Sequence, residues 1–220
     1  MNAHLPTPQA VAAVLADHDV VDHPALPGRT NHLRAGVLVP LVWDPEPTCL
    51  MTLRPRSLRR HGGEICFPGG LPEDGDVDLQ ATALRETWEE LGIRDALVLG
   101  QLCSMPLYTS DYRLVPYVAA VPNAPLVPSV DEVARVLREP IGDWLSRPWL
   151  EGIPYAAGEE EHFSPVFTLE DGLLLFGATA HTFYELLEVM GRAVGRSLPP
   201  MRVSALTWEE IARRVGIRFD

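Results

Sequence analysis

The sequence predicts a mixed α/β domain in which a sheet lies between helices. Segments with the alternating apolar pattern of strands are interspersed with segments of helical periodicity, and turn residues separate them. Neither an internal repeat nor a low-complexity tract is present. A chain of 220 residues is long for one domain and short for two. We therefore expect a single domain over residues 1–220, with a core at about 33–190 and extensions at 1–32 and 196–220.

The first half of the chain is expected to begin with a short helix. Thr7 followed by Pro8 is typical of a helix N-terminus, and the helix should reach about Ala16. Residues 18–31 are rich in proline and glycine and should form an irregular arm. The elements expected next are strands at 33–43 and 49–54, a helix at 78–91, and strands at 97–107 and 112–121.

The second half is expected to contain further helices and one hairpin. Ser129 begins an acidic segment that predicts a helix to about Leu137, and a short turn should follow at 140–145. Glu170-Asp171-Gly172 indicates a hairpin between strands at 163–168 and 173–176. The last elements expected are a long helix at 179–194 and a helix that a capping-box pattern at Thr207 to Glu210 opens and Gly216 ends.

Composition and charge exclude several classes of protein. A formal net charge of −12 argues against nucleic-acid and anionic-membrane partners, which demand a basic surface. The sequence lacks an apolar run of the ~18 residues that a membrane helix needs, and it lacks a signal-like N-terminus, so we expect a cytoplasmic protein. All 18 basic residues are arginine, which excludes Schiff-base and P-loop lysine chemistry. The cysteines form no Cys-x-x-Cys pair and should be buried small hydrophobes.

Three glutamates on the helix at 78–91 are the strongest chemical signal. Glu86, Glu89 and Glu90 are spaced i, i+3 and i+4, which places their carboxylates on one helix face within ~6 Å. Oxygen ligands at this density suit a hard cation such as Mg²⁺ or Mn²⁺. Arg85 lies four residues before Glu89 and can orient a carboxylate. The residues expected to anchor the other face in the core are Ala81, Leu84, Trp88 and Leu91.

The context of these glutamates favours a metal site over the ordinary alternative of a solvated acidic helix face. Gly69 and Gly70 form a tight turn ahead of the helix. Such a turn allows the backbone carbonyl of Gly70 to approach an ion and leaves room for phosphate oxygens beside Gly69. Asp76 adds an acid near the start of the helix, where the helix dipole favours it.

Taken together, these residues resemble the Nudix box, Gly-x5-Glu-x7-Arg-Glu-U-x-Glu-Glu-x-Gly-U, in which U is a bulky aliphatic residue. The matching positions are Gly70, Asp76, Arg85, Glu86, Glu89, Glu90, Gly92 and Ile93. Asp76 replaces the first glutamate, and Thr87 replaces an aliphatic residue. Eight residues rather than seven separate Asp76 from Arg85, a spacing shared with the coenzyme A diphosphatase branch of the family.

The segment before the box is similar to an upstream signature of the same branch, Leu-Leu-Thr-x-Arg-Ser-x3-Arg-x3-Gly-x3-Phe-Pro-Gly-Gly. The chain keeps this spacing from Leu50 through Arg54, Arg59 and Gly63 to Phe67-Pro-Gly-Gly70. Met51 and Pro55 are the departures. Weaker similarities follow at 112–116, 131–140 and 176–180, so the resemblance covers roughly residues 33–190.

The resemblance implies a Nudix-like α/β/α sandwich and hydrolysis of a diphosphate linkage. Glu86, Glu89, Glu90 and Gly70 would hold Mg²⁺ or Mn²⁺, and Glu86, Glu89 and Arg85 would be the catalytic residues. The general base stays open between Glu86, Glu89 and an acid from a later loop. The run Glu159 to Glu161 is left out of the site because such runs are most often plain surface.

An arginine-rich arm precedes the box and is expected to bind substrate together with Gly69. Its members are Arg54, Arg56, Arg59 and Arg60, and His61 adjoins them. Arginine forms bidentate bonds with phosphate, and in the coenzyme A branch this arm is associated with the 3′-phosphate end of the nucleotide. The alternative is a strand end whose arginines are solvated or paired with carboxylates.

The first functional hypothesis is hydrolysis of coenzyme A or acyl-coenzyme A to 3′,5′-ADP and a 4′-phosphopantetheine product. A second is hydrolysis of another nucleoside diphosphate derivative, such as ADP-ribose or a dinucleotide polyphosphate. A third, of another class, is a catalytically silent nucleotide-binding module, which the three retained glutamates disfavour. For the extensions at 1–32 and 196–220, a sheet-edge cover, a homodimer contact and a restriction on substrate entry all stay open.

Overall fold

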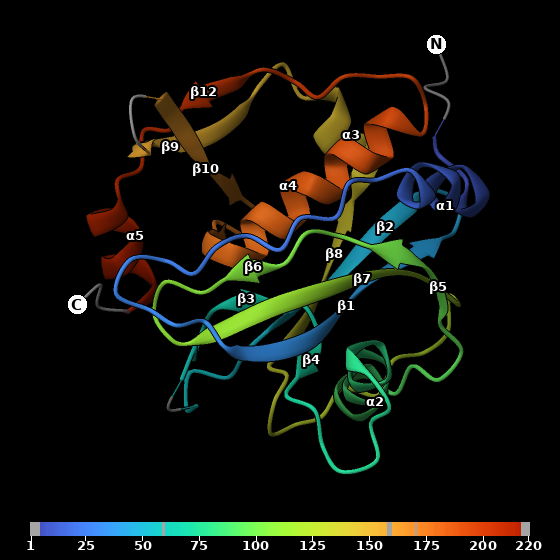
Figure 1. Ribbon diagram of the computed structural model, residues 1–220. Helices are drawn as coiled ribbons and strands as arrows, with labels where there is room; N and C mark the ends of the chain where they lie inside the picture. Colours follow the sequence, from blue (N-terminus) through green and yellow to red (C-terminus); the bar gives the residue numbers. More distant parts are fainter. Residues whose placement is uncertain (1–4, 59, 158–159, 170, 217–220) are drawn as a thin grey trace.

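The computed structural model describes residues 5–58, 60–157, 160–169 and 171–216, and Figure 1 shows their arrangement. The helices are α1 (Pro8–Ala16), α2 (Leu79–Leu91), α3 (Ile141–Ser146), α4 (Gly177–Arg192) and α5 (Trp208–Val215). The strands are β1 (Leu33–Trp43), β2 (Pro47–Leu53), β3 (Ile65–Cys66), β4 (Gly69–Gly70), β5 (Leu97–Gln101), β6 (Met105–Pro106), β7 (Tyr112–Val121), β8 (Arg135–Pro140), β9 (Leu150–Ala157), β10 (Glu160–Thr168), β11 (Leu174–Leu175) and β12 (Met201–Val203). The α/β class predicted from the sequence is confirmed.

The larger sheet is mixed because its central strand β1 runs parallel to β7 and antiparallel to β2. The strand order is β3-β2-β1-β7-β5, with β4 paired to β1, β6 to β7 and β8 to β2. A second sheet has the order β11-β10-β9-β12 and contacts α4 through β10. The second sheet was not predicted as a unit, because the sequence pattern indicated only its β10–β11 hairpin.

Helices cover both faces of the larger sheet (Figure 1). The helix α2 packs against β1 and β7 on one face, whereas α1, α3 and α4 lie on the other. Alternate side chains of β1 serve the two layers, as strand geometry requires. Val37, Val39 and Leu41 belong to the main core beneath α4, and Leu38 and Val42 belong to smaller clusters on the α2 side.

The irregular arm before β1 is confirmed, and specific hydrogen bonds hold it in place. His18 Nε2 lies 2.7 Å from Glu185 Oε1 on α4. The side-chain amide of Asn31 donates to the carbonyl oxygens of Leu107, Ser110 and Tyr112, each at 3.0 Å. These bonds fix the arm against α4 and against the loop that precedes β7.

The helix expected from Ser129 to Leu137 is wrong. Residues 135–140 form β8, which pairs antiparallel with β2 over six positions. The acidic start signal is local, and it is outweighed by the backbone hydrogen bonds available along the edge of β2. The turn expected at 140–145 is the helix α3, whose Ile141, Trp144 and Leu145 are buried.

Other elements match their predictions more closely. Thr7 caps α1 by accepting from the Ala10 N–H at 3.2 Å, and the capping box of α5 is present. The hairpin joins β10 to β11, although Glu170 lies outside the described residues. The strand expected at 97–107 is divided into β5 and β6, and β9 and β12 were not predicted. Throughout the described ranges, each helix is too short or too polar to cross a membrane.

Candidate active site

The acidic helix α2 lies directly against β1 because Gly36 has no side chain. A Cβ atom at Gly36 would lie 2.1 Å from the Leu79 carbonyl oxygen at the start of the helix. Thr82, Ala83 and Thr87 are buried at this interface, where small side chains are needed. The Thr87 hydroxyl donates to the Ala83 carbonyl oxygen at 2.7 Å, so its burial leaves no unpaired hydroxyl.

One residue expected to anchor this helix in the core does not do so. The Trp88 side chain is 44% exposed, and the guanidinium of Arg94 stacks over its ring at 4.7 Å. Ala81 and Leu84 are only partly buried, whereas Leu91 is fully buried. The prediction assumed an apolar face toward the sheet, but the close approach at Gly36 turns the small residues inward instead.

The Gly69–Gly70 turn lies against the glutamates, as predicted. Its two residues form β4, which pairs with β1. The Gly69 N–H donates to Glu90 Oε1 at 3.3 Å, and a Cβ atom on Gly70 would lie 2.3 Å from Glu86 Oε1. The glycines therefore allow two carboxylates to approach the turn more closely than any side chain would permit.

Arg85 is the main counter-charge within the box. Its guanidinium donates to Asp76 at 3.1–3.3 Å, to Glu86 Oε1 at 3.0 Å and to Glu89 Oε2 at 3.2 Å. It also donates to the Leu71 carbonyl oxygen at 3.1 Å. The contact with Glu89 is the one that the helical spacing predicted. Arg85 therefore restrains the rotamers of two of the three glutamates.

Asp76 binds Arg85 and is not part of the cluster of glutamates. Hydrogen bonding to Arg85 lowers the pKa of Asp76 to about 2, assisted by the backbone N–H of Glu73 and by Thr82. The Thr82 hydroxyl donates to the Asp76 carboxylate at 2.9 Å. The Asp76 carboxylate thus already accepts hydrogen bonds from Glu73, Thr82 and Arg85. The sequence had predicted only that Asp76 lies near the start of the helix.

Glu90 is a buried carboxylate with an unsatisfied oxygen. The residue is 3% exposed, and its Oε2 has no hydrogen-bond partner among the described residues. Burial, together with the nearby negative charges of Glu132 and Glu86, raises the pKa of Glu90 to about 7. Burial also raises the pKa of Glu86. Two desolvated carboxylates and an orphaned oxygen beside a glycine turn fit a hard divalent cation.

Glu132 is a member of this site that the sequence analysis missed. It lies in the segment between β7 and β8, whose backbone docks on the end of α2 through Ser129 N–H to Glu90 O at 2.9 Å. Its negative charge raises the pKa of both Glu86 and Glu90. Glu132 lies in the segment at 131–140 that is similar to the family. Because a helix was expected there, the position of Glu132 beside α2 was not predicted. Glu159 lies outside the described residues, as do the side chains of residues 160 and 161.

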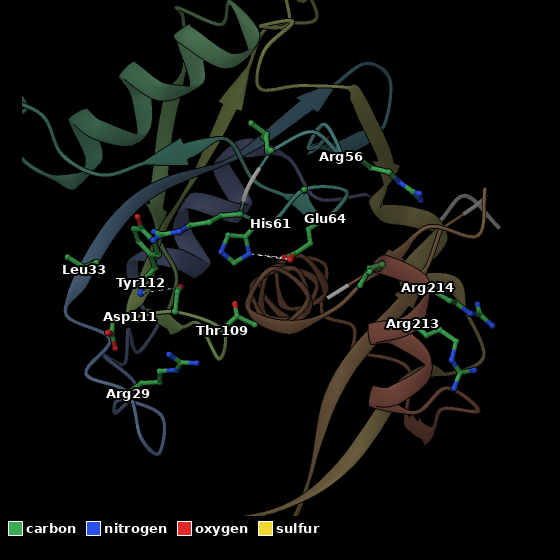
Figure 2. A pocket seen from close by; sticks show the side chains of 16 residues that line it. Arg29, Leu33, Arg56, His61, Glu64, Thr109, Asp111, Tyr112, Arg213 and Arg214 are labelled. Carbon is green, nitrogen blue, oxygen red and sulfur yellow. Dashed lines mark hydrogen bonds and ion pairs between the residues drawn. The ribbon is translucent and has the colours of Figure 1, made fainter. Parts of the chain in front are cut away.

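The predicted arginine arm is divided between two places. Arg54 lies beside the acids, since its charge lowers the pKa of Glu90. Arg60 instead lines a cavity of about 870 Å³, together with Arg56 and His61 (Figure 2). Arg59 lies outside the described residues, so its predicted contact with substrate stays a prediction.

The model of the family described as NUDIX domain matches residues 32–167. The chain belongs to the Nudix domain family. Members of this family generally use divalent metal ions, which agrees with the chemistry of the glutamate cluster. The family predicted from the box is thereby confirmed, whereas the narrower coenzyme A branch stays a prediction.

Curated relatives agree with this family, and the chain also has a likeness to solved structures. The chain is 41% identical over 132 residues to proteins named "Uncharacterized Nudix hydrolase NudL" from Yersinia pestis (strain Pestoides F) and Yersinia pseudotuberculosis serotype O:1b. The match covers 58% of this chain and 65% of each relative, slightly less than two thirds of the relatives' length. A MutT/nudix family protein from Enterococcus faecalis has a TM-score of 0.49 at 18% identity, covering 77% of this chain and 65% of that one. The NUDIX domain of Shewanella oneidensis NrtR, complexed with ADP ribose, has a TM-score of 0.43 at 22% identity, covering 60% and 84%.

Glu90→Gln is expected to stabilise the cation-free protein at high pH. The folded-state pKa of about 7 exceeds the ordinary value of 4.5, so the folded state binds the proton more tightly. The cost of ionising Glu90 is therefore absent below pH 4.5 and grows as the pH rises through 7. Denaturant unfolding in a chelator should show Glu90→Gln more stable than wild type by about 1–3 kcal/mol at pH 8, with the difference shrinking toward pH 5.

The control for this measurement is Glu89→Gln, because the Glu89 side chain is 46% exposed. Its effect on the free energy of unfolding should stay within about 0.5 kcal/mol. A Glu90→Gln variant less stable than wild type at pH 8 in chelator contradicts the assignment of a strained, unpaired carboxylate.

Proposed function

We propose that the protein is a hydrolase of nucleotide-linked diphosphate bonds that uses Mg²⁺ or Mn²⁺. The observation that carries the proposal is the orphaned, buried oxygen of Glu90 beside the Gly69–Gly70 turn. Glu86, Glu89 and Glu90, with the carbonyl of Gly70, would hold the cation. A divalent cation bound there supplies Lewis-acid stabilisation of the charge that develops on the bridging and leaving oxygens.

The residues around the cation have separate tasks. Arg85 is a positioning residue, because it binds Glu86 and Glu89 while Asp76 holds it from the other side. The fixed direction of these carboxylates removes rotamer freedom that a substrate complex would otherwise have to restrict. Arg54, whose positive charge lies near Glu90, is suited to a phosphate oxygen of the substrate.

Glu132 is the acid that we assign as the general base. A water molecule attacks one phosphorus, and a proton of the water passes to the Glu132 carboxylate. The bond from that phosphorus to the bridging oxygen breaks, and its electron pair goes to this oxygen of the leaving phosphate. Glu132 comes from a separate segment that docks on α2, so it can face the substrate without being fixed by Arg85. Glu86 and Glu89 are less suited to this task because Arg85 donates to both.

Coenzyme A or its acyl derivatives are the proposed substrates, giving 3′,5′-ADP and a 4′-phosphopantetheine product. The support is the sequence spacing from Leu50 to Gly70 and the extra residue between Asp76 and Arg85. Arg56 and Arg60 line the neighbouring cavity, which agrees with a substrate that carries a further phosphate group besides the diphosphate.

A panel of diphosphates with Mg²⁺ or Mn²⁺, read by mass spectrometry of the products, tests the substrate. Coenzyme A is expected to give the highest kcat/KM among coenzyme A, dephospho-coenzyme A, ADP-ribose and a dinucleotide polyphosphate. Turnover of coenzyme A well below that of ADP-ribose contradicts the proposed substrate but is consistent with the proposed hydrolase activity. If none of the four is turned over, the proposed hydrolase is contradicted, and binding of a nucleotide without turnover would then support the silent nucleotide-binding module.

Glu132→Gln is expected to lower kcat by about 10²- to 10⁴-fold, the usual contribution of a general base. Cation affinity should change little, because Glu132 is not assigned as a ligand. The matched control is Asp131→Asn, which removes an exposed carboxylate from the neighbouring position. If kcat of Glu132→Gln stays within threefold of wild type, another group accepts the proton.

A further inference from the structure

The cavity beside the arginine arm gathers guanidinium groups from three separate segments of the chain. They are Arg29 of the N-terminal arm, Arg56 and Arg60 of the loop after β2, and Arg213 and Arg214 of α5. Figure 2 shows Arg29 on one side of the cavity and Arg56, Arg213 and Arg214 on the other. The protein as a whole has a net charge of −12, so this concentration of positive charge is local.

The acidic residues of the cavity do not neutralise these arginines. Glu64 is bound to His61 at 3.2 Å, and Asp111 accepts from the backbone N–H groups of Thr30 and Asn31 at 2.8 and 3.3 Å. Among the described residues, no carboxylate lies within ion-pair distance of the five lining arginines. Five guanidinium groups against two carboxylates leave an excess positive charge that suits an anion.

The helix α5 is built to hold two of these arginines in place. Thr207 and Glu210 form the capping box at its start, and Ile211 is buried in a cluster with Ile153 and Val166 of the second sheet. Arg213 and Arg214 are exposed, in the last turn of the helix. Cations in a last turn also stabilise a helix through its dipole. The helix dipole alone does not explain why arginines from other segments gather here. Three more, Arg29, Arg56 and Arg60, line the same cavity.

The cavity and the glutamate site share one loop. Arg54, at the start of this loop, places its charge near Glu90. Its backbone N–H donates to the Glu64 carbonyl oxygen at 3.0 Å, and its own carbonyl oxygen accepts from the Gly63 N–H at 3.1 Å. Glu64 and Gly62 line the cavity. One hydrogen-bonded loop therefore connects the glutamate site with the cavity.

We propose that α5 and the N-terminal arm complete a subsite for a second phosphate, carried by the substrate apart from the scissile diphosphate. The ligand class is a phosphate monoester on a nucleotide, whose oxygens match the planar fork of arginine. Arg29, Arg213 and Arg214 all lie outside the family match at 32–167, so the two extensions supply three of the five arginines that line the cavity. The inference rests on the proposed function, because it assumes that the diphosphate binds at the glutamates.

The kinetic test uses Arg213→Ala, Arg214→Ala and the double variant, with coenzyme A and dephospho-coenzyme A as substrates. The double variant should raise KM for coenzyme A by about 10- to 100-fold, the loss expected for charge-assisted bonds to a phosphate. KM for dephospho-coenzyme A and kcat for both should stay within about threefold. The control is Arg202→Ala, which removes a charge from the same extension where Arg202 stacks on Trp149.

Two kinetic results overturn the subsite. An equal rise in KM for both substrates shows general attraction of anions, and no rise shows that the two arginines only stabilise the end of α5. A thermal midpoint within a few degrees of wild type confirms that the double variant is folded.

Calorimetry separates failure of the subsite from failure of the proposed function. Adenosine 3′,5′-bisphosphate should bind wild type more tightly than AMP does, and the double variant should lose that difference. This result supports the subsite even if no diphosphate is hydrolysed. If wild type binds the two nucleotides equally, the subsite is wrong even where the hydrolase is confirmed.

Discussion

The contact between α2 and β1 at Gly36 determines where the three glutamates of α2 lie. Without a side chain at Gly36 the helix lies directly on the strand, and Glu86 and Glu90 lie against the Gly69–Gly70 turn. The same strand pairs with the turn at Gly69 and Gly70. One strand therefore fixes both the helix that carries the carboxylates and the glycines that approach them, which gives the site its close spacing.

This close spacing lowers the stability of the protein when no cation is bound. Glu90 is desolvated, its Oε2 lacks a partner among the described residues, and neighbouring acids oppose its ionisation. Arg85 offsets part of the charge of Glu86 and Glu89 but does not reach Glu90 in the observed hydrogen bonds. Stability that is given up at one carboxylate is typical of a binding site, because the missing interaction is supplied by a ligand.

Local periodicity predicted α2 and its three glutamates, since their relation depends only on helical spacing. Glu132 could not be predicted in the same way, because its position depends on β8 pairing with β2 over a long sequence separation. The arginine arm looked like one unit, yet the structure places Arg54 at the acids and Arg60 in the cavity. The contribution of α5 was equally hidden, since it follows from the packing of Ile211 on the second sheet.

Titration with Mn²⁺, followed by calorimetry or by the spectrum of the free ion, tests the cation site most directly. Wild type should bind Mn²⁺, and Glu90→Gln should weaken this binding at least tenfold while the protein stays folded and becomes more stable in chelator. The control Glu64→Gln removes an acid that lines the cavity and is not assigned as a cation ligand, and it should leave the affinity unchanged. Equal affinity of Glu90→Gln and wild type for Mn²⁺ contradicts a cation held by the buried carboxylate.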